Sequence, residues 1–184
     1  MSDQAGRSTA ASLFMPIRRG RVLWLRILFW ASRHFSFVTA PMRRLSSIHF
    51  LEWTVLRAVP DSDGAWRRLD RPWLVFESNF DGDLPQYIDT FARSMPWRMR
   101  AVWGCAEGYP GLFPTAPYQD WTDANNVATL HYWCAYPDAT TTTVGAALRV
   151  LEQYETLRAE TRGADASAFA AAYSRFLTEV QGDL

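Results

Sequence analysis

The sequence lacks lysine entirely: all nineteen basic residues in its 184 positions are arginine. The phosphate-binding P-loop, the Ser-x-x-Lys nucleophile, Schiff-base chemistry and the ion pair of protein kinases all depend on a lysine amine. The absence therefore excludes these reaction classes in their usual form.

Cysteine is also scarce, since Cys105 and Cys134 are the only two. Neither belongs to a CxxC pair or to a Cys/His spacing typical of zinc sites, so we expect no metal centre. Two free thiols are typical of a reducing compartment, and the sequence predicts a cytoplasmic protein.

Aromatic residues are abundant, with 9 Trp, 7 Tyr and 11 Phe, which supports a folded core and excludes disorder throughout. The formal net charge is zero but unevenly distributed. Residues 1–50 hold eight Arg and one Asp, a balance of +7, so the remainder carries −7. Because this remainder is acidic and has no nucleic-acid-binding signature, we do not expect nucleic acid as a partner.

Four segments are expected. Residues 1–15 are small and polar at the start and are predicted to be a disordered tail. Residues 16–46 should form a basic amphipathic helical arm, residues 47–160 an α+β domain, and residues 161–184 a C-terminal helix.

The helix expected between Pro16 and Phe37 carries Arg19, Arg26 and Arg33 on one stripe and apolar residues around most of the rest. A transmembrane span is disfavoured because a central arginine costs about 2.5–3.5 kcal/mol on insertion scales. A signal peptide is disfavoured because arginines interrupt its apolar region. Two alternatives stay open: the helix packs on its own body or a second subunit, or it docks on an anionic membrane surface or a partner protein.

In the body, alternation and β-branched or aromatic content predict strands at 48–56, 73–80 and 127–136, with a turn at 61–64. Asp83 resembles a helix N-cap, and the helix after it should end at Pro96. Residues 99–105 fit a strand or a short helix, and 106–126 a long loop. Further helices are expected at about 141–158 and near 166–180.

Four segments occur in a characteristic order: IHFLEWTVL, LVFESNFDGDLPQYIDTF, RAVWGCAEGYP and LHYWCAYPDATTTTVGAALRV. They resemble the IHFARW-like, SNYDGS-like, AVW-to-GYP-like and YSAYP-like segments of a bacterial protein family of unassigned function, over roughly residues 20 to 157. The chain departs from that pattern at Leu51-Glu52, where the family has a small and then a basic residue, and at Cys134, where it has Ser. The resemblance implies a ferredoxin-like antiparallel sheet with helices on one face, of the dimeric α/β-barrel type, and therefore a homodimer.

Strand parity sorts the candidate site residues. Leu74, Phe76, Ser78 and Phe80 should lie under the helices, and Glu77 and Asn79 on the other face, around a cavity or a second subunit. His131 and Trp133 share a face of the late strand and should join them, with either His49 and Trp53 or Glu52 and Thr54. The predicted catalytic residues are thus His131, His49, Glu77 and Asn79, and the predicted substrate-binding residues are Trp53, Trp73, Trp133, Tyr136 and Trp103.

Two functions follow as hypotheses. The first is a small-molecule enzyme with an aromatic-lined pocket over the sheet, a cofactor-independent or haem-dependent oxygenase, peroxidase or cyclase for an aromatic or polyketide-like substrate, by analogy with dimeric barrels. The second is a non-catalytic adaptor, or a membrane-surface-associated binding protein that docks through its basic N-terminal helix.

Overall fold

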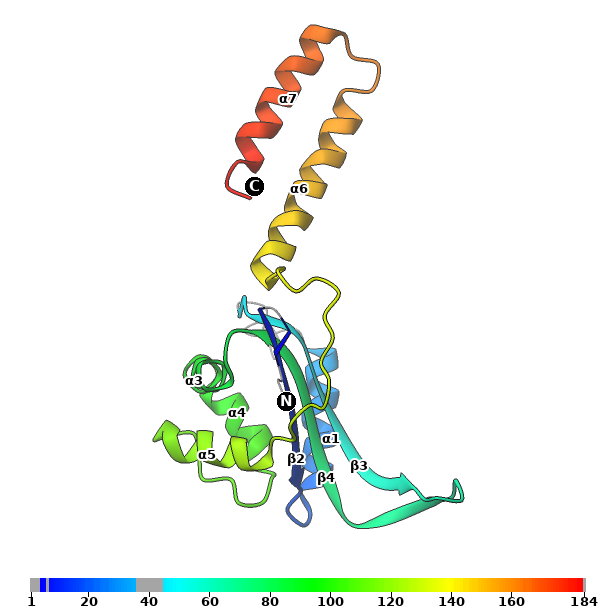
Figure 1. Ribbon diagram of the computed structural model, residues 1–184, viewed down its shortest axis with the longest axis vertical. Coiled ribbons are helices and arrows are strands. Elements are labelled where there is room, and N and C mark those ends of the chain that lie inside the picture. The colour runs from blue at the N-terminus through cyan, green and yellow to red at the C-terminus, as the bar shows by residue number, and fades with distance from the viewer. Residues whose placement is uncertain (1–3, 6, 36–44, 184) are drawn as a thin grey trace. The chain divides into compact units, whose positions relative to one another are not determined.

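The computed structural model describes residues 4–5, 7–35 and 45–183 (Figure 1). The chain divides into two compact units, of which the first ends at Asp138 and the second begins at Ala139. The described residues form four strands and six helices, so the fold is α+β.

The first unit contains one antiparallel sheet with the strand order β1-β2-β4-β3. Its strands are β1 (Gln4–Ala5), β2 (Ser8–Pro16), β3 (Ile48–Pro60) and β4 (Trp66–Asp81). Since β2 and β3 are each antiparallel to β4, they run parallel to one another on either side of it. The helix α1 (Arg21–His34) lies between them in the chain, so it makes the crossover connection.

The prediction of a disordered tail over 1–15 is wrong for Ser8–Pro16. This segment is β2, which pairs with β4 from Ser8↔Asp81 to Pro16↔Trp73. Ala11, Leu13 and Met15 are almost completely buried. The alternation of buried and exposed positions in this segment was not recognised in the sequence because several of its residues are the small Ser and Ala. Small side chains are compatible with a strand that has neighbouring strands on both sides.

The described part of the basic amphipathic helical arm predicted over 16–46 does contain a helix, α1. Pro16 ends β2, and α1 is built into the first unit through the fully buried Leu25. Phe29 of α1 stacks on Trp53 of β3, with 5.8 Å between ring centroids. The helix therefore packs on its own body through one face, as one of the two alternatives proposed; residues 36–44 lie outside the described part.

The predicted parity of β4 is confirmed, because Leu74, Phe76, Ser78 and Phe80 are all buried. Three further helices pack against that face: α3 (Leu84–Ser94), α4 (Pro96–Trp103) and α5 (Thr115–Asn125). The predicted cap is confirmed too, since the Asp83 carboxylate accepts a hydrogen bond of 2.8 Å from the backbone N–H of Gln86.

Three local predictions are settled differently. Residues 99–105, left open between strand and helix, belong largely to α4, and the expected loop 106–126 contains α5. The expected strand 127–136 is wrong: the segment is extended but forms no ladder, and only Asn126 bridges to Leu13. Since β1 already occupies the edge of β2 at Ser8 and Thr9, continued pairing along that edge is blocked.

The second unit consists of α6 (Thr141–Glu160) and α7 (Ala166–Val180), which confirms both predicted helices. The boundary predicted at residue 160 is wrong, because α6 groups with α7 and not with the sheet. Leu157, Ala172 and Val180 are buried in this unit. Within the described ranges, no helix combines the length and apolar character needed to cross a membrane.

Candidate functional site

The helix-free face of the sheet carries two carboxyl groups in direct opposition. Glu52 of β3 and Glu77 of β4 are cross-strand partners. Burial raises the pKa of Glu77, and the neighbouring Glu52 carboxyl raises it further. A carboxyl pair of this kind holds a proton more readily than an isolated glutamate does.

A β-bulge brings His49 to the same face. The register shifts between Ile48, which opposes Phe80, and Phe50, which opposes Asn79, so that His49 is the extra residue. Its Nε2 lies 2.8 Å from Asp81 Oδ1. Parity alone would have separated His49 from Glu52, and the bulge is why both side chains lie on the face of Glu77 and Asn79.

Asn79 belongs to a hydrogen-bonded group at the end of β4. Its Nδ2 donates to the hydroxyl of Tyr132, which is also 2.8 Å from the Ser8 hydroxyl. The segment 127–136, which follows α5, therefore crosses the helix-free face and is held there by the hydrogen bonds of Tyr132. Tyr132 was not among the predicted site residues, and its position in an alternating segment was the only available signal.

The other predicted site residues are dispersed. Trp73 shares the helix-free face by its register with Leu56 and Pro16, but Trp53 and Trp103 lie on the helix-covered face. His131, Trp133 and Tyr136 are exposed in the extended segment. The sequence predicted one cavity-facing set, whereas the structure distributes its members over two faces and an exposed segment.

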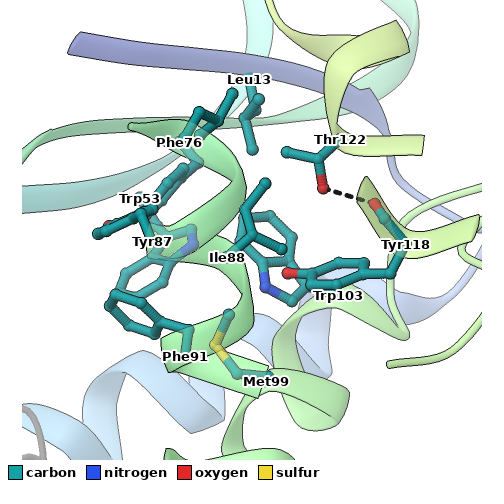
Figure 2. A pocket seen from close by; sticks show the side chains of 11 residues that line it. Leu13, Trp53, Phe76, Tyr87, Ile88, Phe91, Met99, Trp103, Tyr118 and Thr122 are labelled. Atoms are coloured by element: carbon teal, nitrogen blue, oxygen red, sulfur yellow. Dashed lines mark hydrogen bonds between the residues drawn. The ribbon is translucent and has the colours of Figure 1, made fainter. Parts of the chain in front are cut away.

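On the helix-covered face, aromatic rings fill the space between the sheet and α3, α4 and α5 (Figure 2). Phe76 lies 5.2 Å from both Trp53 and Trp103, measured between ring centroids, and Tyr87 stacks on Phe80 at 3.8 Å. The remaining cavity is about 10 Å³. It has room for about one water molecule and is lined almost wholly by apolar groups, so it is packed core and not a ligand site.

Two indole N–H groups in this core are unsatisfied. Trp53 Nε1 and Trp103 Nε1 are buried and have no hydrogen-bond partner in the described part of the chain. Leaving a buried donor unpaired costs about 1–3 kcal/mol, so each such group requires a compensating reason.

A larger pocket of about 290 Å³ lies between α1, β3 and α4. Its size is close to the lower end of ligand pockets, roughly 300–1,000 Å³. The apolar lining residues are Leu28 and Phe29 of α1, Leu51 and Trp53 of β3, and Met95, Trp97, Met99 and Val102 from α4 and the residue before it. We call this space the α1–α4 pocket.

The α1–α4 pocket also has polar lining residues. They include Ser32, Arg33 and Arg98, and the Arg98 guanidinium lies 4.1 Å from the centre of the Trp97 ring. Glu52 lines the pocket as well, and it is the cross-strand partner of Glu77. The pocket thus combines a mainly apolar lining with two cationic side chains.

The predicted histidines and cysteines do not fit a haem or nucleophile role in this pocket. No histidine is among its described lining residues, His49 is engaged by Asp81, and His131 is exposed. Both cysteines are free thiols, and burial raises the pKa of the Cys105 thiol, which disfavours the reactive thiolate.

Of the predicted catalytic and substrate-binding residues, Trp53 alone lines the α1–α4 pocket, together with Glu52, which was an alternative member of the predicted set. The others escaped prediction because α1 was treated as an arm and α4 was left undecided between strand and helix. Arg33 was noticed only as part of a charged stripe.

Comparisons with protein-family models, with curated protein sequences and with solved structures found no match.

Proposed function

We propose that the protein binds a small amphipathic anion, an aliphatic or aromatic carboxylate, in the α1–α4 pocket. The observation that carries this proposal is the composition of the pocket, about 290 Å³ with a mainly apolar lining that includes Arg33 and Arg98. An apolar body would be removed from water against Leu28, Phe29 and Met99, at about 25 cal/mol per Å² buried.

Charge in the pocket lining specifies the class of ligand. Arg33 makes no ion pair with any described residue, and both Arg33 and Arg98 line the α1–α4 pocket. Guanidinium groups favour carboxylates because their donors match the two carboxylate oxygens. A neutral apolar molecule would have no group that pairs with the two guanidinium groups.

Fluorescence titration tests the proposal. Decanoate and 3-phenylpropionate should displace 1-anilinonaphthalene-8-sulfonate, itself an apolar anion, in a saturable manner and should quench tryptophan emission. Arg33→Gln and Arg98→Gln should each weaken carboxylate binding by about tenfold, which corresponds to about 1.4 kcal/mol. Val102→Phe should abolish it by filling the pocket.

Arg67→Gln is the matched control, because Arg67 is an exposed arginine in the β3–β4 hairpin that pairs with Asp61 at 3.5 Å. This variant should bind like the original protein. Decanol in place of decanoate should bind both arginine variants and the original protein equally. Equal carboxylate affinity in all three arginine variants would contradict the proposal.

A second candidate is proton-transfer chemistry on the helix-free face, within a ferredoxin-like dimer. The parallel strands β2 and β3 with β4 between them form a split β-α-β unit, and a second copy covering the helix-free face would enclose Glu77 and the His49–Asp81 pair. The raised pKa of Glu77 supports a proton-donating role.

Light scattering and substrate profiling distinguish this candidate. A dimer whose ketone-enolisation or cyclisation activity falls on Glu77→Gln and on His49→Gln would favour it. A monomer would remove the enclosure on which it depends.

A further inference from the structure

α1 and α4 lie side by side and both carry exposed aromatic and basic side chains. Leu23, Ile27 and Trp30 recur on the side of α1 opposite the buried Leu25, and all three are exposed. Trp24 Nε1 donates a hydrogen bond of 2.9 Å to Ala101 O, which fixes α4 beside α1. Exposed Trp97 of α4 adds a further indole.

All formal charge on these two helices is positive. Arg21, Arg26 and Arg33 belong to α1, and Arg98 and Arg100 to α4, and neither helix contains an aspartate or glutamate. Arg26, Arg33 and Arg100 form no ion pair within the described ranges. Other exposed arginines, such as Arg71, Arg93 and Arg149, do have acidic partners.

From this combination we infer that the α1–α4 surface docks on an anionic lipid bilayer, with α1 lying in the plane of the interface. Exposed Leu and Ile side chains would enter the acyl boundary, the tryptophans would lie at headgroup depth, and the arginines would meet phosphate groups. None of this requires a helix that spans the membrane.

Charge also decides between a bilayer and a second copy of the chain. In a two-fold symmetric pairing, the same patch lies on both sides of the interface. The arginines of one copy would then approach those of the other with no acidic residue on either helix to compensate them. Lipid phosphates provide the opposite charge that a symmetric dimer lacks.

Vesicle sedimentation with the full chain tests the inference. The protein should pellet with phosphatidylcholine vesicles that contain phosphatidylglycerol, much less with phosphatidylcholine alone, and less as salt is raised. Leu23→Glu should weaken binding by about tenfold or more, and Arg26→Gln by about fivefold.

Leu148→Glu is the matched control, because Leu148 of α6 is 62% exposed and Leu23 is 66% exposed. It should leave vesicle binding unchanged. Equal binding to neutral and anionic vesicles, no binding at all, or equal losses for Leu23→Glu and Leu148→Glu would each overturn the inference. The inference would also be overturned if light scattering showed that the protein is a dimer and that Leu23→Glu dissociates this dimer.

Ligand binding in the α1–α4 pocket and membrane docking by the α1–α4 surface can be tested independently. Val102→Phe should remove carboxylate binding and leave vesicle binding intact, because Val102 lines the pocket and is 8% exposed. Loss of vesicle binding in this variant would mean that lipid enters through the pocket and would contradict docking by the outer face.

Discussion

Glu52 and Glu77 face each other across adjacent strands on the helix-free face of the sheet. Because like charges opposite one another in a sheet destabilise it by roughly 0.2–1 kcal/mol, Glu77→Gln should raise the free energy of unfolding at pH 7 by about that amount. The measurement is urea denaturation of the two proteins.

The pH dependence provides the control for that variant. A pKa raised in the folded state means that the folded protein holds the proton more tightly, so its stability is greatest below the ordinary value of 4.5 and falls as pH rises above it. The advantage of Glu77→Gln should therefore disappear near pH 4. If Glu77→Gln is still more stable than the original protein near pH 4, then side-chain packing and not charge repulsion explains its stability.

Leu13→Ala tests β2 as an inner strand of the sheet. Leu13 is almost fully buried, and such truncations cost about 2–5 kcal/mol. Leu130→Ala is the control, since Leu130 is exposed, and it should change stability little. Thermal unfolding compares them, and equal effects would mean that the N-terminal segment is not part of the core.

Asp83→Ala should remove the N-cap of α3 and cost about 1 kcal/mol in urea denaturation. The side chain accepts a hydrogen bond from the Gln86 backbone N–H, and asparagine keeps an oxygen in that position. Asp83→Asn should therefore lose much less. If both variants lose the same amount, charge at the helix terminus matters more than the cap.

Tyrosine ionisation should unfold the first unit at alkaline pH. Burial raises the pKa of Tyr109 from its ordinary value of 10.0 to about 12, and it also raises the pKa of Tyr87 and Tyr118. Stability from these residues is fully present below about pH 10 and is lost as pH rises above it. Absorbance of tyrosinate should rise together with loss of structure, and Tyr109→Phe should reduce the pH dependence.

Strong local patterns were predictable from the sequence. The helices α3, α6 and α7 lie close to their expected positions, and β4 contains the predicted strand 73–80 but begins earlier, at Trp66. Asp83 caps a helix by contacting a residue close to it in the chain. The buried residues of β4 all lie on one face of one strand, so their alternation is visible in the sequence.

Other features depended on distant partners. Pro96 separates α3 from α4 as predicted, but it also begins α4, and Pro117 lies in the first turn of α5, within a segment predicted as a loop. In a first turn, the missing N–H of proline removes no helical hydrogen bond. The segment 127–136 has the alternation of a strand, but β1 leaves it too little free edge. The bulge at His49 changed which side chains share a face, and parity could not anticipate it.

The position of β2 has a consequence for how the chain is made. It leaves the ribosome before its pairing partner β4 and before the helices that cover it. At about 5–20 residues per second, the apolar side of β2 remains unpaired for several seconds until β4 has been synthesised. Chaperone binding to the nascent chain should therefore be strongest between the emergence of β2 and that of Asp81.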